Sequence, residues 1–214
     1  MDADDHVADL PVVGGKWCDK ISVGAHMLDY DSLIVLTHFK GHSAGGFGGA
    51  NKNIGIGCAD GRLGKIWIHT RTGSTDRWGI KEEEFMERIA ESTKSVVDHF
   101  GDKVVYVNVM RNMSVSCDCE GLKAQPVVTP NVGILASTDL LAIDQACVDL
   151  VYAMRDEDNH DLVERMETRH GLRQLTYMKE LHMGNDRYQL IDTDNDDVVI
   201  TPAQGVEHVV PFEG

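Results

Sequence analysis

A continuous apolar run that leads directly into a glycine-rich stretch constrains the fold of this chain more than any other feature. The run SLIVLTHF (32–39) has the length of a strand buried on both faces, which is typical of parallel sheets. The seventeen residues that follow Lys40, GHSAGGFGGANKNIGIG, contain seven glycines. Because glycines let the backbone approach a ligand closely, we predict a functional loop here rather than a flexible surface segment.

The rest of the chain alternates between strand-like and helix-like patterns. The clearest helix is IKEEEFMERIAESTKSVVDHF (80–100), in which apolar residues recur at helical spacing and Gly101 follows the last turn. We also predict strands at 19–23, 103–110, 133–137 and 187–194, helices at 24–31, 138–154 and 158–183, and a strand or extended loop at 66–70. This alternation predicts a single α/β domain over 1–214, with a largely parallel sheet flanked by helices.

Charge and hydropathy exclude two classes of partner. The formal net charge is −15 and the 20 lysines and arginines are scattered, so the sequence offers no basic patch for nucleic acid. No apolar stretch approaches the roughly 20 residues that cross a membrane. The acidic N-terminus MDADDHVADLP lacks the basic flank and apolar core of a signal peptide, so we predict a cytoplasmic protein.

The glycine-rich stretch has no standard nucleotide-binding pattern. It contains neither GxxxxGK[ST] nor a strict GxGxxG after the strand. Lys52 within it could contact an anion or carry a covalent adduct, and the alternative is a solvated lysine on a surface loop. The predicted cofactor-binding residues of the stretch are Gly45, Gly46, Gly48, Gly49, Lys52 and Asn53.

Three histidines lie near the predicted edge of the sheet. His38 and His42 flank the end of the apolar run in HFKGH, and His69 follows the glycine-rich stretch. Each alone is more often a structural histidine, but three near one edge could converge on a metal ion. Neutral imidazoles suit nickel, zinc, copper or iron.

Five cysteines, an odd number, do not form a disulfide framework. Cys117 and Cys119, in SCDCEG, are too close in sequence for an easy mutual disulfide but can bridge to a metal. The alternative is two small thiols buried at a turn. Cys58, directly after the glycine-rich stretch, is a further candidate ligand.

An acidic run near the C-terminus resembles a calcium-binding loop only in part. Asp192, Asp194 and Asp196 match the first three ligand positions of an EF-hand. However, Asp197 stands at the glycine position and Ala203 at the glutamate position, so we predict a solvated turn.

Three segments resemble, in order, the uncharacterised iron–sulfur centre proteins (domain of unknown function 362). They are DSLIVLTHFKGHSAGGFGGANKNIGIGCADGRLGK, SVSCDCEG and NVGILASTDLLAIDQACVDLV, and the resemblance covers about residues 12–191. Many members carry a ferredoxin-like insert with CxxCxxC clusters, but GKIWIHTRTGSTDRWGIKEEEF has no cysteine here. An iron–sulfur cluster is therefore not expected. Members usually have a further N-terminal segment, so we expect a shortened chain, or one that needs a partner subunit or second copy.

A more distant resemblance is to lactate racemase-type enzymes, which use a nickel-pincer nucleotide. Those enzymes have a histidine, a cofactor-bearing lysine in a glycine-rich stretch, and a nickel-binding histidine, in the order of His42, Lys52 and His69 here. The resemblance implies that His42 is an acid or base, Lys52 a covalent or anionic anchor, and His69 a metal ligand.

These observations predict a protein that binds a metal or cofactor at its glycine-rich stretch, with a small-molecule substrate or a redox partner. If it is an enzyme, the predicted reaction is abstraction of a proton or hydride next to a carbonyl. The alternatives are a non-catalytic metal or iron–sulfur module for electron transfer, and a truncated interaction subunit, with a homo-oligomer or a partner subunit in either case. Nickel, zinc and iron are the candidate metals. The candidate catalytic residues are His42 and Lys52, and the candidate metal ligands are His38, His42, Cys58, His69, Cys117 and Cys119.

Overall fold

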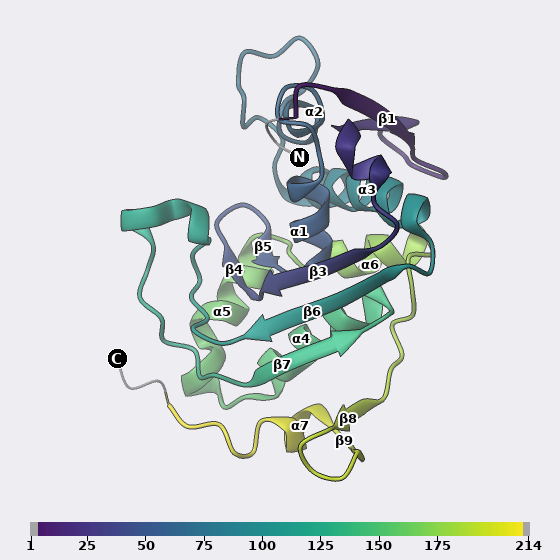
Figure 1. The fold of residues 1–214 in the computed structure, drawn as a ribbon. Coiled ribbons are helices and arrows are strands. Elements are labelled where there is room, and N and C mark those ends of the chain that lie inside the picture. The colour runs from purple at the N-terminus through teal and green to yellow at the C-terminus, as the bar shows by residue number, and fades with distance from the viewer. Residues whose placement is uncertain (1–3, 212–214) are drawn as a thin grey trace.

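The structure is a computed structural model that describes residues 4–211. In it, the apolar run at 32–39 forms β3 (Leu33–His38), the first strand of a three-stranded sheet. β3 pairs in parallel with β6 (Val104–Met110), and β6 pairs in antiparallel fashion with β7 (Gly133–Ser137). The resulting order is β3-β6-β7 (Figure 1). The fold is therefore mixed α/β, but the prediction of a largely parallel sheet is not confirmed, because only β3 and β6 run parallel among the described strands.

The connection between β6 and β7 explains the antiparallel pairing. A parallel neighbour needs a crossover to the opposite end of the sheet, usually through an α-helix. The segment 111–132 contains the short 3₁₀ helix η2 (Asp118–Lys123) and no α-helix, and it returns to the end of the sheet that it left. The strand at 133–137 is thus predicted correctly in position, while its direction depends on the path of this connection.

Helices cover one face of the sheet. Helices α1 (Ala50–Gly57) and α4 (Leu140–Ala153) pack on it, and α3 (Glu82–Phe100) packs behind α1 and against α6 (Arg173–Glu180) (Figure 1). The strand side chains on this face, such as Val35 and Tyr106, belong to the main core.

The opposite face of the sheet is open and apolar. Ile34 and Leu36 of β3 are 73% and 66% exposed, and Ile134 of β7 is 65% exposed. Alternate residues of a strand point to opposite faces, so these side chains project from the side without helices.

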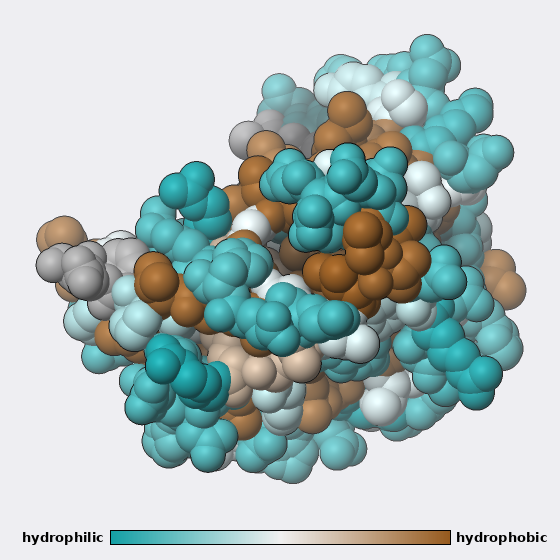
Figure 2. Space-filling view, turned by 90° about the horizontal axis from the view of Figure 1, so that it is seen from below, coloured by the Kyte–Doolittle hydropathy of each residue, from teal (hydrophilic) through white to brown (hydrophobic). Residues whose placement is uncertain are grey.

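Shorter elements surround this framework. The N-terminal part has β1 (Val7–Pro11) paired with β2 (Lys20–Gly24), followed by η1 (Ala25–Asp29) and later α2 (Gly64–His69). The C-terminal part has α5 (Asp156–Thr168), the hairpin of β8 (Leu190–Asp192) and β9 (Val198–Ile200), and α7 (Pro202–Gly205). Figure 2 views the side on which β8, β9 and α7 lie, where apolar side chains stand among hydrophilic ones. Among residues 4–211 no helix has the length and hydropathy needed to cross a membrane.

The patterns at 19–23, 24–31, 80–100, 103–110 and 138–154 are confirmed as β2, η1, α3, β6 and α4. The helical region 158–183 is divided into α5 and α6, and β8 occupies part of the strand predicted at 187–194. The strand or extended loop predicted at 66–70 is wrong, because these residues lie in and just after α2. A short apolar segment fits both the helical and the strand periodicity. Here α2 packs against α3, and this contact favours the helix, in which Ile68 is fully buried.

The glycine-rich stretch is not one loop. It forms the end of β4 (Lys40–His42), the strand β5 (Gly46–Gly48) and the whole of α1. The acidic run at 192–197 spans the end of β8 and the turn toward β9, in agreement with the predicted exposed turn.

Candidate metal centre

The β4–β5 hairpin holds His42 at its turn. β4 follows β3 directly, and His42 pairs with Gly46 across the hairpin. The Nδ1 atom of His42 accepts hydrogen bonds from the backbone N–H groups of Gly45 at 2.8 Å and Ala44 at 3.2 Å. These bonds fix the ring and place the proton of the neutral imidazole on Nε2.

Helix α1 begins directly after this hairpin, and a side chain of the protein itself binds the first backbone amides of the helix. The carboxylate of Asp144, in α4, accepts hydrogen bonds from the N–H groups of Ala50 at 2.7 Å and Asn51 at 2.9 Å. Asp144 is fully buried and also accepts a hydrogen bond from Asn108 Nδ2. The amides that would bind a phosphate in a nucleotide-binding loop are therefore engaged, while Lys52 projects from the first turn of α1.

Close backbone contact brings the cysteine segment to the hairpin. Gly41 N donates a hydrogen bond of 2.7 Å to Ser114 O. A Cβ atom at Gly41 would lie 2.4 Å from the carbonyl oxygen of Val115, so only glycine allows this approach. Arg165 of α5 holds the same segment through a hydrogen bond to Val115 O.

A capping box then shapes the turn that carries both cysteines. Cys117 is the N-cap of η2, and its Sγ accepts a hydrogen bond from Cys119 N. In return, Glu120 accepts a hydrogen bond of 2.8 Å from Cys117 N. This reciprocal arrangement turns both thiols toward the same side.

His42, Cys117 and Cys119 converge as a candidate metal-binding group. One ring nitrogen of His42 and the two Sγ atoms all lie within 4.8 Å of one another, and the Sγ atoms are 2.8 Å apart. His42 and Cys117 are buried while Cys119 is exposed, so the group is accessible from one side.

Burial and nearby cations keep His42 neutral. Burial lowers its pKa to about 3, and the positive charges of Lys52 and Lys40 contribute to this shift. Burial also lowers the pKa of Lys52, whereas Cys117 opposes that shift. Burial and the hydrogen bond with Cys117 raise the pKa of Cys119, so a metal has to displace the proton of this thiol.

A second group of charged side chains lies beside the cysteines. Asp118 contacts His38 Nδ1 at 3.1 Å and Lys40 Nζ at 3.5 Å. Burial alone would raise the pKa of Asp118, but the hydrogen bond with His38 and the charge of Lys40 bring it below its usual value. His38 also contacts Arg111 O through Nε2 at 2.8 Å, so both of its ring nitrogens already have protein partners.

A hollow of about 530 Å³ adjoins His38 at the carboxyl ends of β3 and β6. This is the end of the sheet at which ligands of α/β proteins usually bind. Its lining residues are Leu36, Thr37, His38, Val109, Arg111 and Asn112.

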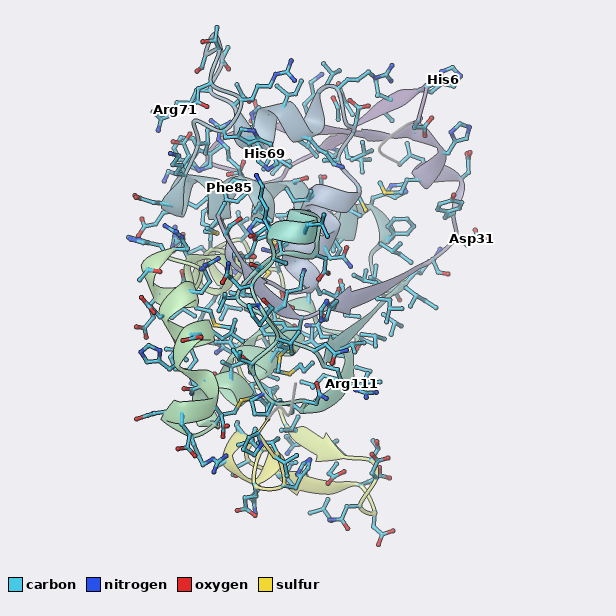
Figure 3. The ribbon with its side chains drawn as sticks, turned by 90° about the vertical axis from the view of Figure 1, so that its left-hand side faces the viewer. His6, Asp31, His69, Arg71, Phe85 and Arg111 are labelled. Atoms are coloured by element: carbon cyan, nitrogen blue, oxygen red, sulfur yellow. The ribbon has the colours of Figure 1, made fainter. Side chains whose placement is uncertain are left out.

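Three of the six predicted metal ligands come together, and three do not. Cys58 lies at the C-terminal end of α1 in the main core, where burial raises its pKa to about 11. His69, in α2, contacts Lys65 O through Nδ1, and its ring packs on Trp78. The ring also packs on Phe85, beside which it lies in Figure 3. Together with His38, these residues lie outside the group that His42 and the two cysteines form.

The predicted cofactor-binding residues have different surroundings. Gly45 borders the ring of His42, Gly46 packs on Gly171, and Gly49 packs on Asp144. A Cβ atom at Gly48 would lie 3.2 Å from Lys40 Nζ and 3.9 Å from Lys52 Cδ, so Gly48 borders both lysines. Asn53 donates hydrogen bonds to Leu36 O and Thr37 Oγ1 and so ties α1 to β3. Cofactor binding by these residues stays a prediction.

Sequence reasoning missed several charged neighbours of this group. The sequence did contain a signal for two of them: Lys40 lies between His38 and His42 in HFKGH, and Asp118 lies between the two cysteines in CDC. By contrast, Arg165 acts on His42 and donates a hydrogen bond to Val115 O from helix α5, far along the chain, and no local pattern marks it.

Comparison with known proteins identifies the family of this chain. The family model described as domain of unknown function (DUF362) matches residues 1–149, and the chain belongs to this family. No curated protein and no solved structure matches the chain.

Proposed function

We propose that this member of the DUF362 family binds a divalent metal ion through His42, Cys117 and Cys119, with zinc or nickel as the cation. The observation that carries the proposal is the convergence of these three ligand atoms within 4.8 Å, although Cys117 lies 75 positions after His42. Two thiolates and an imidazole are a donor set that soft and borderline divalent metals prefer.

The geometry fits a metal ion after small adjustments. Zinc binds sulfur at about 2.3 Å and nitrogen at about 2.0–2.1 Å, so tetrahedral ligand atoms lie roughly 3.5–3.8 Å apart. The Sγ atoms, now 2.8 Å apart, must separate by about 1 Å, which rotation of the exposed Cys119 side chain allows. Three protein ligands leave one coordination position open, as in catalytic rather than structural zinc sites.

Ligation by His42 requires a change in its hydrogen bonds. Since Nδ1 accepts from Ala44 and Gly45, Nε2 is the nitrogen available to a metal. Nε2 must first release its proton, and the neutral ring then carries a proton on Nδ1, which cannot accept these hydrogen bonds. Metal binding is therefore coupled to the conformation of the hairpin turn.

A cation held by these three residues would polarise a carbonyl oxygen at its open position, which would favour abstraction of a proton from the neighbouring carbon. Lys52 and Lys40 line the same region and can orient a small molecule with a negative charge. We therefore place the small-molecule substrate of the predicted enzyme at this site. Two cysteines are too few for the usual four-cysteine cluster, so the site favours a single metal ion over the electron-transfer alternative.

Cobalt substitution tests the centre. The full chain is purified under reducing conditions, stripped of metal with a chelator, and titrated with Co²⁺. We expect intense thiolate-to-cobalt charge-transfer absorption in the near ultraviolet and a tetrahedral cobalt spectrum in the visible range. Cys117→Ala and Cys119→Ala should each weaken the charge-transfer band, and the double variant should abolish it.

Cys58→Ala is the matched control, because Cys58 is a buried thiol outside the group. This variant should bind Co²⁺ as the unmodified chain does. Absence of the charge-transfer band in the unmodified chain, or its persistence in the double variant, would overturn the proposal. Iron and acid-labile sulfide in protein purified without oxygen would favour the electron-transfer module instead.

A further inference from the structure

We infer that a groove between the free edge of β7 and the C-terminal hairpin β8–β9 binds an extended, basic segment of a partner protein. The segment would add a strand to β7, with apolar residues at every second position and lysine or arginine between them. The groove has a volume of about 1030 Å³. None of its lining residues belongs to the proposed metal centre, so the two sites can be tested separately.

β7 is an edge strand whose outer side is open. In the order β3-β6-β7 it pairs with β6, and no other described strand pairs with it. All five residues of β7 line the groove, on the side where β8, β9 and α7 lie in Figure 1. An unpaired edge presents backbone N–H and C=O groups with which an extended chain can pair. The groove therefore contains a template for one more strand.

The other edge of the sheet, at β3, is partly occupied. The carbonyl oxygen of Leu36 accepts a hydrogen bond of 3.0 Å from Asn53 Nδ2, a side chain of α1. By contrast, no side chain among residues 4–211 makes a hydrogen bond to the backbone of residues 133–137. An added strand is therefore expected at β7 rather than at β3.

Apolar side chains line the groove beside this edge. Ile143 and Leu150 of α4, Leu190 of β8 and Ile200 of β9 all contribute to its surface. A Cβ atom at Gly205 of α7 would lie 2.9 Å from Leu150, 3.5 Å from Leu190 and 3.6 Å from Ile200, so these three side chains meet at Gly205. Because alternate residues of a strand point to the same face, every second residue of a bound segment can contact these side chains.

The full charges at the groove are all negative. Asp192, Asp194, Asp197 and Glu207 line it, and its lining contains no lysine or arginine. None of these four carboxylates makes an ion pair with a residue that the structure describes. A basic segment supplies the complementary charge, whereas a second copy of a chain with a net charge of −15 would add negative charge.

A defined peptide tests the inference on the full chain. The probe is fluorescein-labelled KVKVKV, and fluorescence anisotropy measures its binding. We expect saturable binding that weakens as the salt concentration rises, because exposed charges are screened. The peptides KKKVVV and EVEVEV should bind more weakly, because the first lacks the alternation and the second carries the wrong charge.

Methylation of the peptide backbone separates strand pairing from simple charge attraction. Two versions of KVKVKV carry N-methyl groups on the odd or on the even amides. Successive amides of a strand point to opposite edges, so only one of the two versions loses its donors to β7. We expect one version to bind much more weakly than KVKVKV and the other to bind similarly.

The double variant Asp194→Asn/Asp197→Asn tests the role of the acidic turn. It should bind KVKVKV about fivefold more weakly and show a smaller salt dependence, because two exposed charge pairs are lost. Asp29→Asn/Asp31→Asn is the matched control, since both residues are exposed and neither lines the groove. Asp31 lies far from the C-terminal hairpin in Figure 3.

Several outcomes would overturn the inference. They are the absence of saturable binding of KVKVKV, equal binding of KKKVVV, and equal binding of both methylated peptides. Equal losses in the two double variants would also overturn it, because overall charge rather than the groove would then govern binding. Two-dimensional ¹H–¹⁵N NMR places the peptide: amide shifts at residues 133–137 support the inference, and shifts confined to β3 contradict it.

Discussion

Gly49 stands where β5 ends and α1 begins, with no room for a side chain. A Cβ atom there would lie 2.5 Å from Oδ1 of the buried Asp144, the carboxylate that holds the first amides of α1. We expect Gly49→Ala to lower the free energy of unfolding by about 2 kcal/mol, because either the carboxylate or the helix must move. Urea unfolding followed by circular dichroism measures the change.

Gly57, at the other end of the same helix, is the matched control. Its Cβ atom would lie 3.7 Å from the nearest atom, Oδ1 of Asn53, which is an ordinary contact. Gly57→Ala should therefore leave stability unchanged or raise it by roughly 0.5 kcal/mol through the lower entropy of the unfolded chain. Equal losses for the two variants would show that the contact with Asp144 is unimportant.

Glu87 makes the stability of the protein depend on pH in the acidic range. Burial alone would raise its pKa, but hydrogen bonds from Lys16, Arg173 and Trp17 bring the pKa below its ordinary value of 4.5. A carboxyl group whose pKa is lower in the folded state than in the unfolded state stabilises the fold at pH values above the unfolded-state pKa. This contribution is lost as the pH falls through the folded-state pKa. Glu87→Gln should therefore be less stable at pH 7 by about 2 kcal/mol and lose less stability between pH 6 and about pH 3.

The exposed Glu83, in the same helix, provides the comparison for this measurement. Glu83→Gln should follow the unmodified chain at every pH, because the Glu83 side chain is 63% exposed and its ion pair, with His170, is a surface pair at 3.5 Å. If Glu87→Gln and the unmodified chain have parallel pH profiles, the network around Glu87 does not govern acid stability.

At the level of elements, the β4–β5 hairpin should respond to metal. His42 gives up the hydrogen bonds from Ala44 and Gly45 when Nε2 binds a cation, so the amide resonances of these two residues should shift when Zn²⁺ is added. The amides of Ala50 and Asn51 are an internal control, because Asp144 holds them with or without metal. Two-dimensional ¹H–¹⁵N NMR reports all four amides. A shift at Cys119 without one at Gly45 would mean that the cysteines bind metal and His42 does not.

The same hairpin marks the limit of what the sequence predicts. The strand β3 and the helix α3 follow from their own apolar patterns, and both were predicted. Helix α1 was missed, because glycines and asparagines disfavour a helix and the carboxylate that caps it, Asp144, lies 94 residues beyond Ala50. The pairing of His42 with two cysteines likewise depends on the contact between Gly41 and Val115, which no local pattern reveals.

At the scale of the whole molecule, the sheet has one covered face and one open face. The sequence predicts helices on both faces, because residues 33–36 of SLIVLTHF are apolar at every position and so do not distinguish one side of the strand from the other. Since β7 returns in antiparallel fashion without a crossover helix, no helix covers the side of Ile34, Leu36 and Ile134 among the described residues. The predicted homo-oligomer or partner subunit stays a prediction.

Two neighbouring residues of β3 test this asymmetry. Val35 is 5% exposed and packs in the main core, whereas Leu36 is 66% exposed on the open face. We expect Val35→Ala to lower the free energy of unfolding by about 2 kcal/mol and Leu36→Ala by less than about 0.5 kcal/mol, although leucine loses more atoms. Urea unfolding at several protein concentrations measures both. A loss at Leu36 that matches the loss at Val35 and grows with concentration would contradict an open face, because the side chain would then be buried between chains.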